Sequence, residues 1–209
     1  MDSDAYWAVV GRLRLRLADL LETLGPEEWD HPSLCAGWRV RDVAGHLSLV
    51  PTITVREMAA AAPRARFDPD RINTHLARRY GAAEPGEIVD RIRRHAGDRT
   101  TAWALSTANS LFDIEVHSQD IAIPLGRAFP VAPEDTVPGL ERVWTMGWPF
   151  RARRRLGHLA LRATDADWAV GDGPEVRGPA LALLLLLTGR GATAAPDLTG
   201  PGVELLALA

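Results

Sequence analysis

The chain has 209 residues, with 27 acidic against 24 basic side chains and a formal net charge of −3. This length can bury a core without disulfides or a structural metal, and the acidic balance gives no basic excess for nucleic acid or an anionic membrane. The longest apolar run, around residues 181–187, is far shorter than the roughly 20 residues of a membrane-spanning helix. With one cysteine, Cys35, and no leader before the first amphipathic segment, we expect a cytoplasmic protein without disulfides.

Helical signals dominate the first part of the chain. Apolar residues recur at helical spacing over residues 4–24, with Ser3 placed to cap this helix and Gly25-Pro26 to end it. After a packed loop, a second helix is predicted from about Trp38 to Pro63, kinked at Pro51. Three more helices are predicted over residues 68–81, over 84–105, and from Asn109 or Ser110 to about residue 124. These are four long helices and a short one, a number typical of a four-helix bundle.

The pattern changes after a predicted hinge at residues 130–139. A helix from Leu140 to Trp148 is followed by alternating residues with a Gly-Asp-Gly turn at 171–173, which predicts strands joined by a hairpin. A leucine-rich helix over 179–188 and a last helix or strand over 196–209 complete the chain. We therefore predict a mainly α fold, with an up-down helical bundle at residues 1–135 and a small α+β domain at residues 136–209.

Residues 110–127 carry unusual ionisable chemistry for an apolar helix. Asp113 and His117 are four residues apart, so both side chains lie on one helical face and provide half of a metal site. A third ligand must come from another helix, and His46 in "WRVRDVAGHL" fits, because Ala44 and Gly45 leave room beside it. Asp42 has the same spacing to His46, but its place in the first turn favours a capping role. From spacing alone, histidines that are merely hydrogen-bonded remain the commoner alternative.

Two stretches carry a family resemblance. The strings "PSLCAGWRVRDVAGHL" and "FDIEVHSQDIAIPLGR" resemble the mycothiol-dependent maleylpyruvate isomerase family, whose N-terminal domain is a DinB-like (YfiT-like) four-helix bundle. The resemblance implies a divalent metal, usually zinc, held by His46, Asp113 and His117. It also implies that the C-terminal region is a shortened sterol-carrier-like module.

The chain departs from the family pattern at two positions. Asp113 stands where the family has glutamate, and this shorter side chain draws the carboxylate back from the metal. Arg39 stands where the family has Thr or Ser as a helix cap, so the cap must come from another group.

Other ionisable residues have two interpretations each. Asp120 either orients a ligand histidine or bonds to the backbone. Glu115, on the opposite side of its helix, faces solvent or another helix. Cys35 is more simply a small buried apolar residue than a redox or ligand residue. Arg190 either contacts an anionic substrate or thiol, or interacts with a helix C-terminus for structural reasons.

The resemblance favours a metal- and thiol-dependent enzyme. Mycothiol would serve as thiol cofactor or cosubstrate, with a metal-bound thiolate attacking a small electrophilic substrate in an isomerisation or an S-transfer. The use of arginine for every basic residue fits a GC-rich, actinobacterial source. Two alternatives stay open: a non-catalytic metal- or ligand-binding regulatory protein, and a thiol-independent metal hydrolase.

Overall fold

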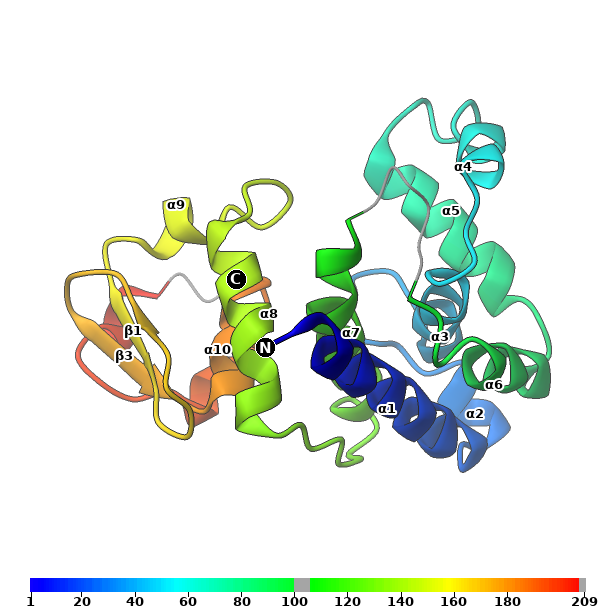
Figure 1. The fold of residues 1–209 in the computed structure, drawn as a ribbon. Coiled ribbons are helices and arrows are strands. Elements are labelled where there is room, and N and C mark those ends of the chain that lie inside the picture. The colour runs from blue at the N-terminus through cyan, green and yellow to red at the C-terminus, as the bar shows by residue number, and fades with distance from the viewer. Residues whose placement is uncertain (100–105, 207–209) are drawn as a thin grey trace. The chain divides into compact units, whose positions relative to one another are not determined.

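A computed structural model describes residues 1–99 and 106–206. The chain divides into two compact units, of which the first contains residues 1–110 and 117–129 and the second contains residues 111–116 and 130–209 (Figure 1). Helices dominate, and a small three-stranded sheet lies in the second unit. The predicted fold class, mainly α with a small C-terminal α+β part, is confirmed. The domain boundary at residue 135 stays a prediction.

Among its described residues, the first unit contains helices and one isolated bridge between Pro32 and Arg39. Helix α1 packs against α6, and α3 packs against both α5 and α6. The side chain of Asp2, and not the predicted Ser3, caps α1 by accepting a hydrogen bond from the Ala5 amide at 2.8 Å. The helices are α1 (Ser3–Glu22), α2 (Pro26–Trp29), α3 (Val40–Leu49), α4 (Val55–Ala61), α5 (Pro69–Gly81), α6 (Pro85–Arg94), the short 3-10 helix η1 (Thr107–Asn109) and α7 (Ser110–Ala122).

The predicted second helix was wrong in one respect, because it is two helices and not one kinked helix. α3 ends at Leu49, and α4 begins at Val55. Pro51 has no amide hydrogen to continue the helical ladder, and Thr54 then starts α4 by accepting a hydrogen bond from the amide of Glu57 at 3.2 Å. The helix predicted over 84–105 ends at Arg94, and its residues 100–105 lie outside the described residues.

Two glycines let α3 and α5 cross closely. A Cβ atom at Gly45 would lie 2.3 Å from the amide nitrogen of Gly81, and one at Gly81 would lie 2.5 Å from the carbonyl oxygen of Arg41. The backbone of α5 therefore fills the space beside Gly45, which corrects the expectation that this glycine leaves room for the His46 side chain. The crossing fixes where α3, and with it His46, lies in the first unit.

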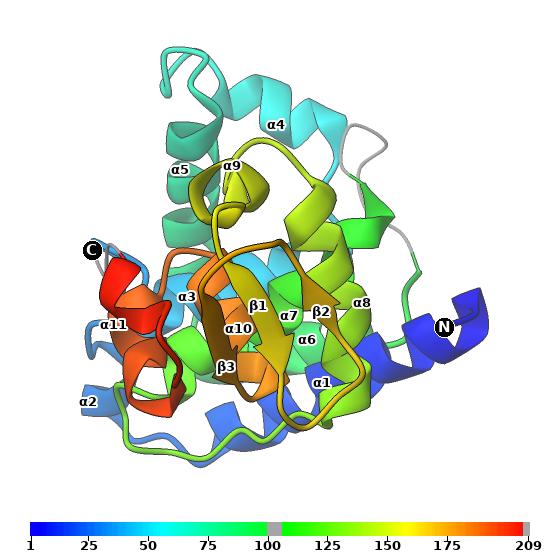
Figure 2. The ribbon, with the colours of Figure 1, turned by 90° about the vertical axis from the view of Figure 1, so that its left-hand side faces the viewer.

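The second unit packs helices on a sheet. The strand order is β2-β1-β3, with β1 antiparallel to β2 and parallel to β3, and α10 lies against β1 and β3 (Figure 2). The elements are α8 (Pro133–Thr145), α9 (Ala152–Leu156), β1 (Ala160–Ala163), β2 (Ala169–Val170), β3 (Glu175–Gly178), α10 (Ala180–Leu187), α11 (Gly191–Ala194), η2 (Ala195–Asp197) and η3 (Val203–Leu205).

Three predictions in this unit need correction. The hinge at residues 130–139 is largely the start of α8, since Pro133 occupies its first turn, where a missing amide hydrogen costs nothing. The turn at residues 171–173 connects β2 to β3, which are not paired, and the hairpin is formed by β1 and β2 instead. Over residues 196–206, the chain forms short 3-10 turns and a bridge between Thr199 and Arg177, not a last helix or strand.

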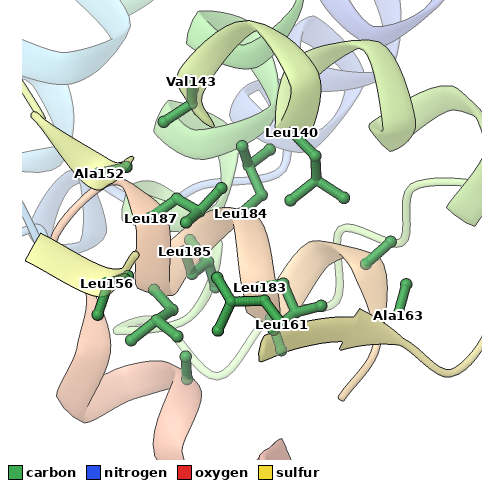
Figure 3. Packing of buried hydrophobic residues seen from close by; sticks show 14 of the residues in the cluster. Leu140, Val143, Ala152, Leu156, Leu161, Ala163, Leu183, Leu184, Leu185 and Leu187 are labelled. Carbon is green, nitrogen blue, oxygen red and sulfur yellow. The ribbon is translucent and has the colours of Figure 1, made fainter. Parts of the chain in front are cut away.

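Leucines of α10 form the core of the second unit. Leu183, Leu184 and Leu187 are fully buried, and Figure 3 shows them beside Leu140 of α8 and Leu161 of β1. This explains the leucine-rich sequence of α10, because the helix is surrounded by apolar neighbours on nearly every side. Among the described residues, no helix combines the length and apolar character that crossing a membrane requires.

Candidate metal centre

Helices α3 and α7 bring two histidines together. The imidazole centroids of His46 and His117 are 4.9 Å apart, with the ring planes at 75°. One donor atom from each of His46, Asp113 and His117 lies within 4.8 Å of the other two. The structure thus assembles the three residues that the sequence singled out as candidate ligands.

The continuity of α7 determines the place of Asp113. The division between the compact units falls inside this helix, but Asp113 and His117 are one helical turn apart on the same element, so the helix itself fixes their spacing. His46 and His117 both belong to the first unit.

The donor set fits a divalent cation. Two imidazole nitrogens and a carboxylate oxygen form a common three-ligand set for zinc, which leaves a further coordination position for water or substrate. All three side chains are half-buried, so the site is neither sealed by the core nor spread over the surface.

A capping interaction explains how α3 begins without the family's Thr or Ser. The backbone amide of Arg39 donates to Oδ2 of Asp42 at 2.9 Å, and Asp42 is buried. The Arg39 guanidinium also donates to Asp42 at 3.2 Å, and this hydrogen bond raises the pKa of Arg39. The predicted capping role of Asp42 is confirmed, and α3 begins at Val40 as a result.

Sequence reasoning missed Trp38 as a wall of the site. Its indole lies nearly parallel to the His117 ring, with centroids 6.4 Å apart and planes at 14°, and meets the His46 ring at 5.7 Å. The indole Nε1 donates to Oγ1 of Thr74 at 3.4 Å, and Thr74 belongs to the lining of a cavity of about 340 Å³ on α5 together with Arg71 and Arg78. A tryptophan directly before the helix that carries a candidate ligand was the available signal.

Asp120 and Cys35 lie on the other side of His117. Oδ2 of the fully buried Asp120 is 2.8 Å from Nδ1 of His117. The thiol of Cys35 donates to the same oxygen at 3.0 Å, and its sulfur is 3.5 Å from Nδ1 of His117. Cys35 is therefore half-buried against two polar groups, a setting different from the apolar one that its sequence context suggested.

Glu115 and Arg190 both belong to the second unit, and their contacts there are as follows. Glu115 is fully buried beside Gly139 of α8, so it faces another helix and not solvent. Burial, and then the charge of Asp135, raise the pKa of Glu115 well above its usual range. Arg190 donates to the carbonyl oxygen of Thr188 at 2.7 Å, just beyond the C-terminus of α10.

A cavity larger than the one beside Thr74 lies elsewhere in the described chain. It has a volume of about 800 Å³ and is lined by residues of α8 and β2 in the second unit, among them Trp144 and Trp168. None of the candidate ligands contributes to it. The convergence of donor atoms, and not cavity size, marks the candidate site.

Comparison with known proteins finds a family match in the N-terminal part of the chain. Residues 10–71 match the model of the mycothiol maleylpyruvate isomerase N-terminal domain. The family resemblance is confirmed. This match contains His46 but ends before α7, so it does not extend to Asp113 and His117.

Two solved structures share the fold of this chain over nearly its whole length. One is the crystal structure of the mycothiol-dependent maleylpyruvate isomerase, at a TM-score of 0.62 and 13% sequence identity, covering 98% of this chain and 95% of the other. The other is a histidine-to-alanine mutant of that isomerase, at a TM-score of 0.61 with the same identity and coverage. At this identity the likeness shows the fold alone. No curated protein matches the chain.

Proposed function

We propose that the protein is a divalent-metal-dependent enzyme that uses a low-molecular-weight thiol, mycothiol, to isomerise a small electrophilic substrate or transfer sulfur to it. The observation that carries the proposal is the convergence of donor atoms from His46, Asp113 and His117 within 4.8 Å. The match of residues 10–71 to the mycothiol maleylpyruvate isomerase N-terminal domain supports the choice of thiol.

The three candidate ligands would hold the cation, with zinc as the proposed ion. When bound, such an ion keeps the sulfur of a thiol in its thiolate form at neutral pH. The shorter Asp113 reaches the site because it precedes His117 by one helical turn, so its carboxylate projects from the same face of α7. His46 supplies the ligand from the second helix, as a site between bundle helices requires.

Neighbouring residues orient and shield this site. Asp120 accepts the Nδ1 hydrogen of His117 in the tautomer whose Nε2 carries the lone pair that would bind a cation. The Trp38 ring covers one face of His117 and the edge of His46, which limits access of water from that side. Arg71 and Arg78, in the cavity beside Thr74, offer guanidinium donors for carboxylate groups of a small substrate.

The thiol chemistry allows two outcomes. Addition of a thiolate to an activated double bond, rotation about the resulting single bond, and elimination of the same thiolate give cis–trans isomerisation. If the carbon–sulfur bond is kept and the carbanion takes up a proton, the outcome is S-transfer. The maleylpyruvate isomerase of similar fold is described as mycothiol-dependent, which makes isomerisation the first activity to assay.

The decisive experiment measures metal content and thiol dependence together. We expect the purified protein to take up at least one zinc per chain, and zinc with mycothiol to raise its thermal midpoint more than zinc alone. H46A and H117A should each bind less zinc than wild type, whereas H158A, at an exposed histidine of the second unit, should bind as much.

The same assay separates the alternatives. Turnover that persists without a thiol would indicate a metal hydrolase. Stoichiometric binding of metal and mycothiol without turnover of maleylpyruvate or other electrophiles would indicate a regulatory binding protein. A wild-type chain that cannot be loaded with any divalent cation would reject the proposal.

A further inference from the structure

The loop before α3 aims the single thiol of the chain at α7. The amide of Leu34 donates to the carbonyl oxygen of Asp120 at 3.1 Å, and the amide of Trp38 donates to that of Cys35 at 2.9 Å. The hydroxyl of Ser33 donates to the Trp38 carbonyl at 2.9 Å and accepts from the Cys35 amide at 3.2 Å. These backbone contacts hold Cys35 from both sides, so the position of its sulfur beside His117 and Asp120 is set by the loop.

A sulfur, a nitrogen and an oxygen atom, each able to bind a metal ion, lie close together at this point. The separations are 3.0 Å from the Cys35 sulfur to Oδ2 of Asp120, 3.5 Å from that sulfur to Nδ1 of His117, and 2.8 Å from Nδ1 to Oδ2. In a tetrahedral zinc site, donor atoms lie about 3.3–3.6 Å apart, because the bonds to the metal are about 2.0–2.3 Å long. The sulfur–nitrogen separation already has this value, and the two carboxylate separations need to lengthen by only a few tenths of an ångström.

This triplet is distinct from the group that contains His46 and Asp113. Both groups meet the geometric condition for holding a cation, with His117 as the shared member. Since Nδ1 of His117 faces Cys35 and Asp120, Nε2 remains for the other group. The buried carboxylate of Asp120 adds a negative charge that favours a cation at this point.

We propose that Cys35, Asp120 and Nδ1 of His117 form a second cation position, selective for thiophilic divalent ions such as Zn²⁺ and Cd²⁺. Thiolate ligands favour such ions over Mg²⁺ or Ca²⁺, which prefer oxygen. On binding, the metal–sulfur bond replaces the S–H bond, and the proton leaves to solvent together with any hydrogen carried by Nδ1. The proposal does not depend on the proposed function, because neither His46 nor Asp113 belongs to this position.

Occupation of the second position affects the first position, the one formed by His46, Asp113 and His117. A cation bound at Nδ1 removes the hydrogen bond from His117 to Asp120, which orients the ring for the Nε2 position. Thiophilic ions in excess are therefore expected to act as inhibitors of any activity supported by the first position.

Cobalt provides the test, because thiolate ligation to Co²⁺ produces a near-ultraviolet charge-transfer band that nitrogen and oxygen ligands do not give. Wild type and H46A, both with the thiol reduced, are titrated with Co²⁺ alone. We expect the band in both proteins and its loss in C35S, in which a hydroxyl replaces the thiol in nearly the same volume. D120N should weaken the band in titrations of H46A, and circular dichroism confirms that each variant is folded.

The outcomes separate this proposal from the proposed function. Absence of the band in wild type and H46A, with one titratable thiol per chain, overturns the second position. A band that appears in wild type but disappears in H46A also overturns it, since the sulfur would then reach the cation held by His46. If C35S binds no zinc while H46A shows the band, the second position stands and the proposed function fails.

Discussion

The Nδ1 atom of His117 lies 2.8 Å from Oδ2 of Asp120, a carboxylate with no exposed surface. A carboxylate placed there fixes the tautomer and orientation of an imidazole and makes its other nitrogen a better ligand. We predict that D120N lowers the zinc affinity of the site formed by His46, Asp113 and His117 about 10- to 100-fold. Competition with a chelator of known affinity measures the change.

The control for this variant is D90N, at an exposed position of α6, which should leave zinc affinity unchanged. To separate orientation from folding, the thermal midpoints of both variants are measured without metal. Equal zinc affinity in D120N and D90N would show that Asp120 does not orient a metal ligand.

The sequence predicted the candidate ligands because helical spacing is a local property. Asp113 and His117 share a face of α7 whatever the rest of the fold does, and the family motif singled out His46 as the partner. The sequence did not predict that Cys35 lies beside His117, because this contact joins residues 82 positions apart through a loop whose course depends on hydrogen bonds of Ser33 and Leu34. Loops of this kind lack the hydrophobic periodicity from which the sequence predicts helices and strands.

The errors in the predicted secondary structure also arise where the outcome depends on contacts that the local sequence pattern does not specify. A proline inside a helical pattern predicts either a kink or a break. Here the chain breaks between Leu49 and Val55, and the cap formed by Thr54 and Glu57 starts a new helix. In the second unit, the glycine turn at residues 171–173 was interpreted as a hairpin, but the parallel pairing of β1 and β3 depends on partners that a short strand pattern cannot specify.

The crossing of α3 and α5 gives a second prediction. G45A places a methyl group 2.3 Å from the backbone nitrogen of Gly81, and because backbone cannot yield as a flexible side chain does, the helices must separate. We expect a loss of about 3 kcal/mol or more in the free energy of unfolding, with weaker zinc binding as His46 moves. Urea denaturation and zinc titration measure the two effects.

G86A is the matched control, since a Cβ atom at Gly86 of α6 meets no atom within 4 Å. Alanine favours a helix over glycine by up to about 1 kcal/mol, so G86A should be neutral or stabilising. Comparable destabilisation by the two substitutions would contradict the role assigned to the close crossing.

A buried arginine provides the third prediction. Nη1 of Arg14, on α1, donates to the carbonyl oxygens of His95, Ala96 and Asp98 at 3.3, 3.2 and 2.8 Å, just after the end of α6. Its loss leaves these carbonyls without this charged donor, so we expect R14M to lower the free energy of unfolding by about 2–4 kcal/mol. R56M, at an exposed arginine of α4, should change it by no more than about 0.5 kcal/mol. Chemical denaturation of both variants measures the two free energies of unfolding. Equal denaturation midpoints for R14M and R56M would contradict the role assigned to Arg14.

Glu115 makes stability depend on pH, and the sign follows from its raised pKa. Burial favours the protonated form of this side chain in the folded protein, whereas in the unfolded chain the carboxyl ionises near its usual value of 4.5. Above that pH the folded state holds a proton that the unfolded state has released. Stability therefore falls as pH rises from the unfolded pKa towards the folded one, by up to about 1.4 kcal/mol per pH unit.

We predict that E115Q, which keeps the shape but cannot ionise, removes this decline. Urea unfolding of wild type and E115Q should give similar free energies near pH 4, with E115Q gaining relative to wild type as the pH is raised to about 8. E134Q, at an exposed glutamate at the start of α8, should follow the wild-type profile. Parallel profiles for wild type and E115Q would mean that Glu115 ionises in the folded protein at its ordinary pH, which its burial beside Gly139 of α8 argues against.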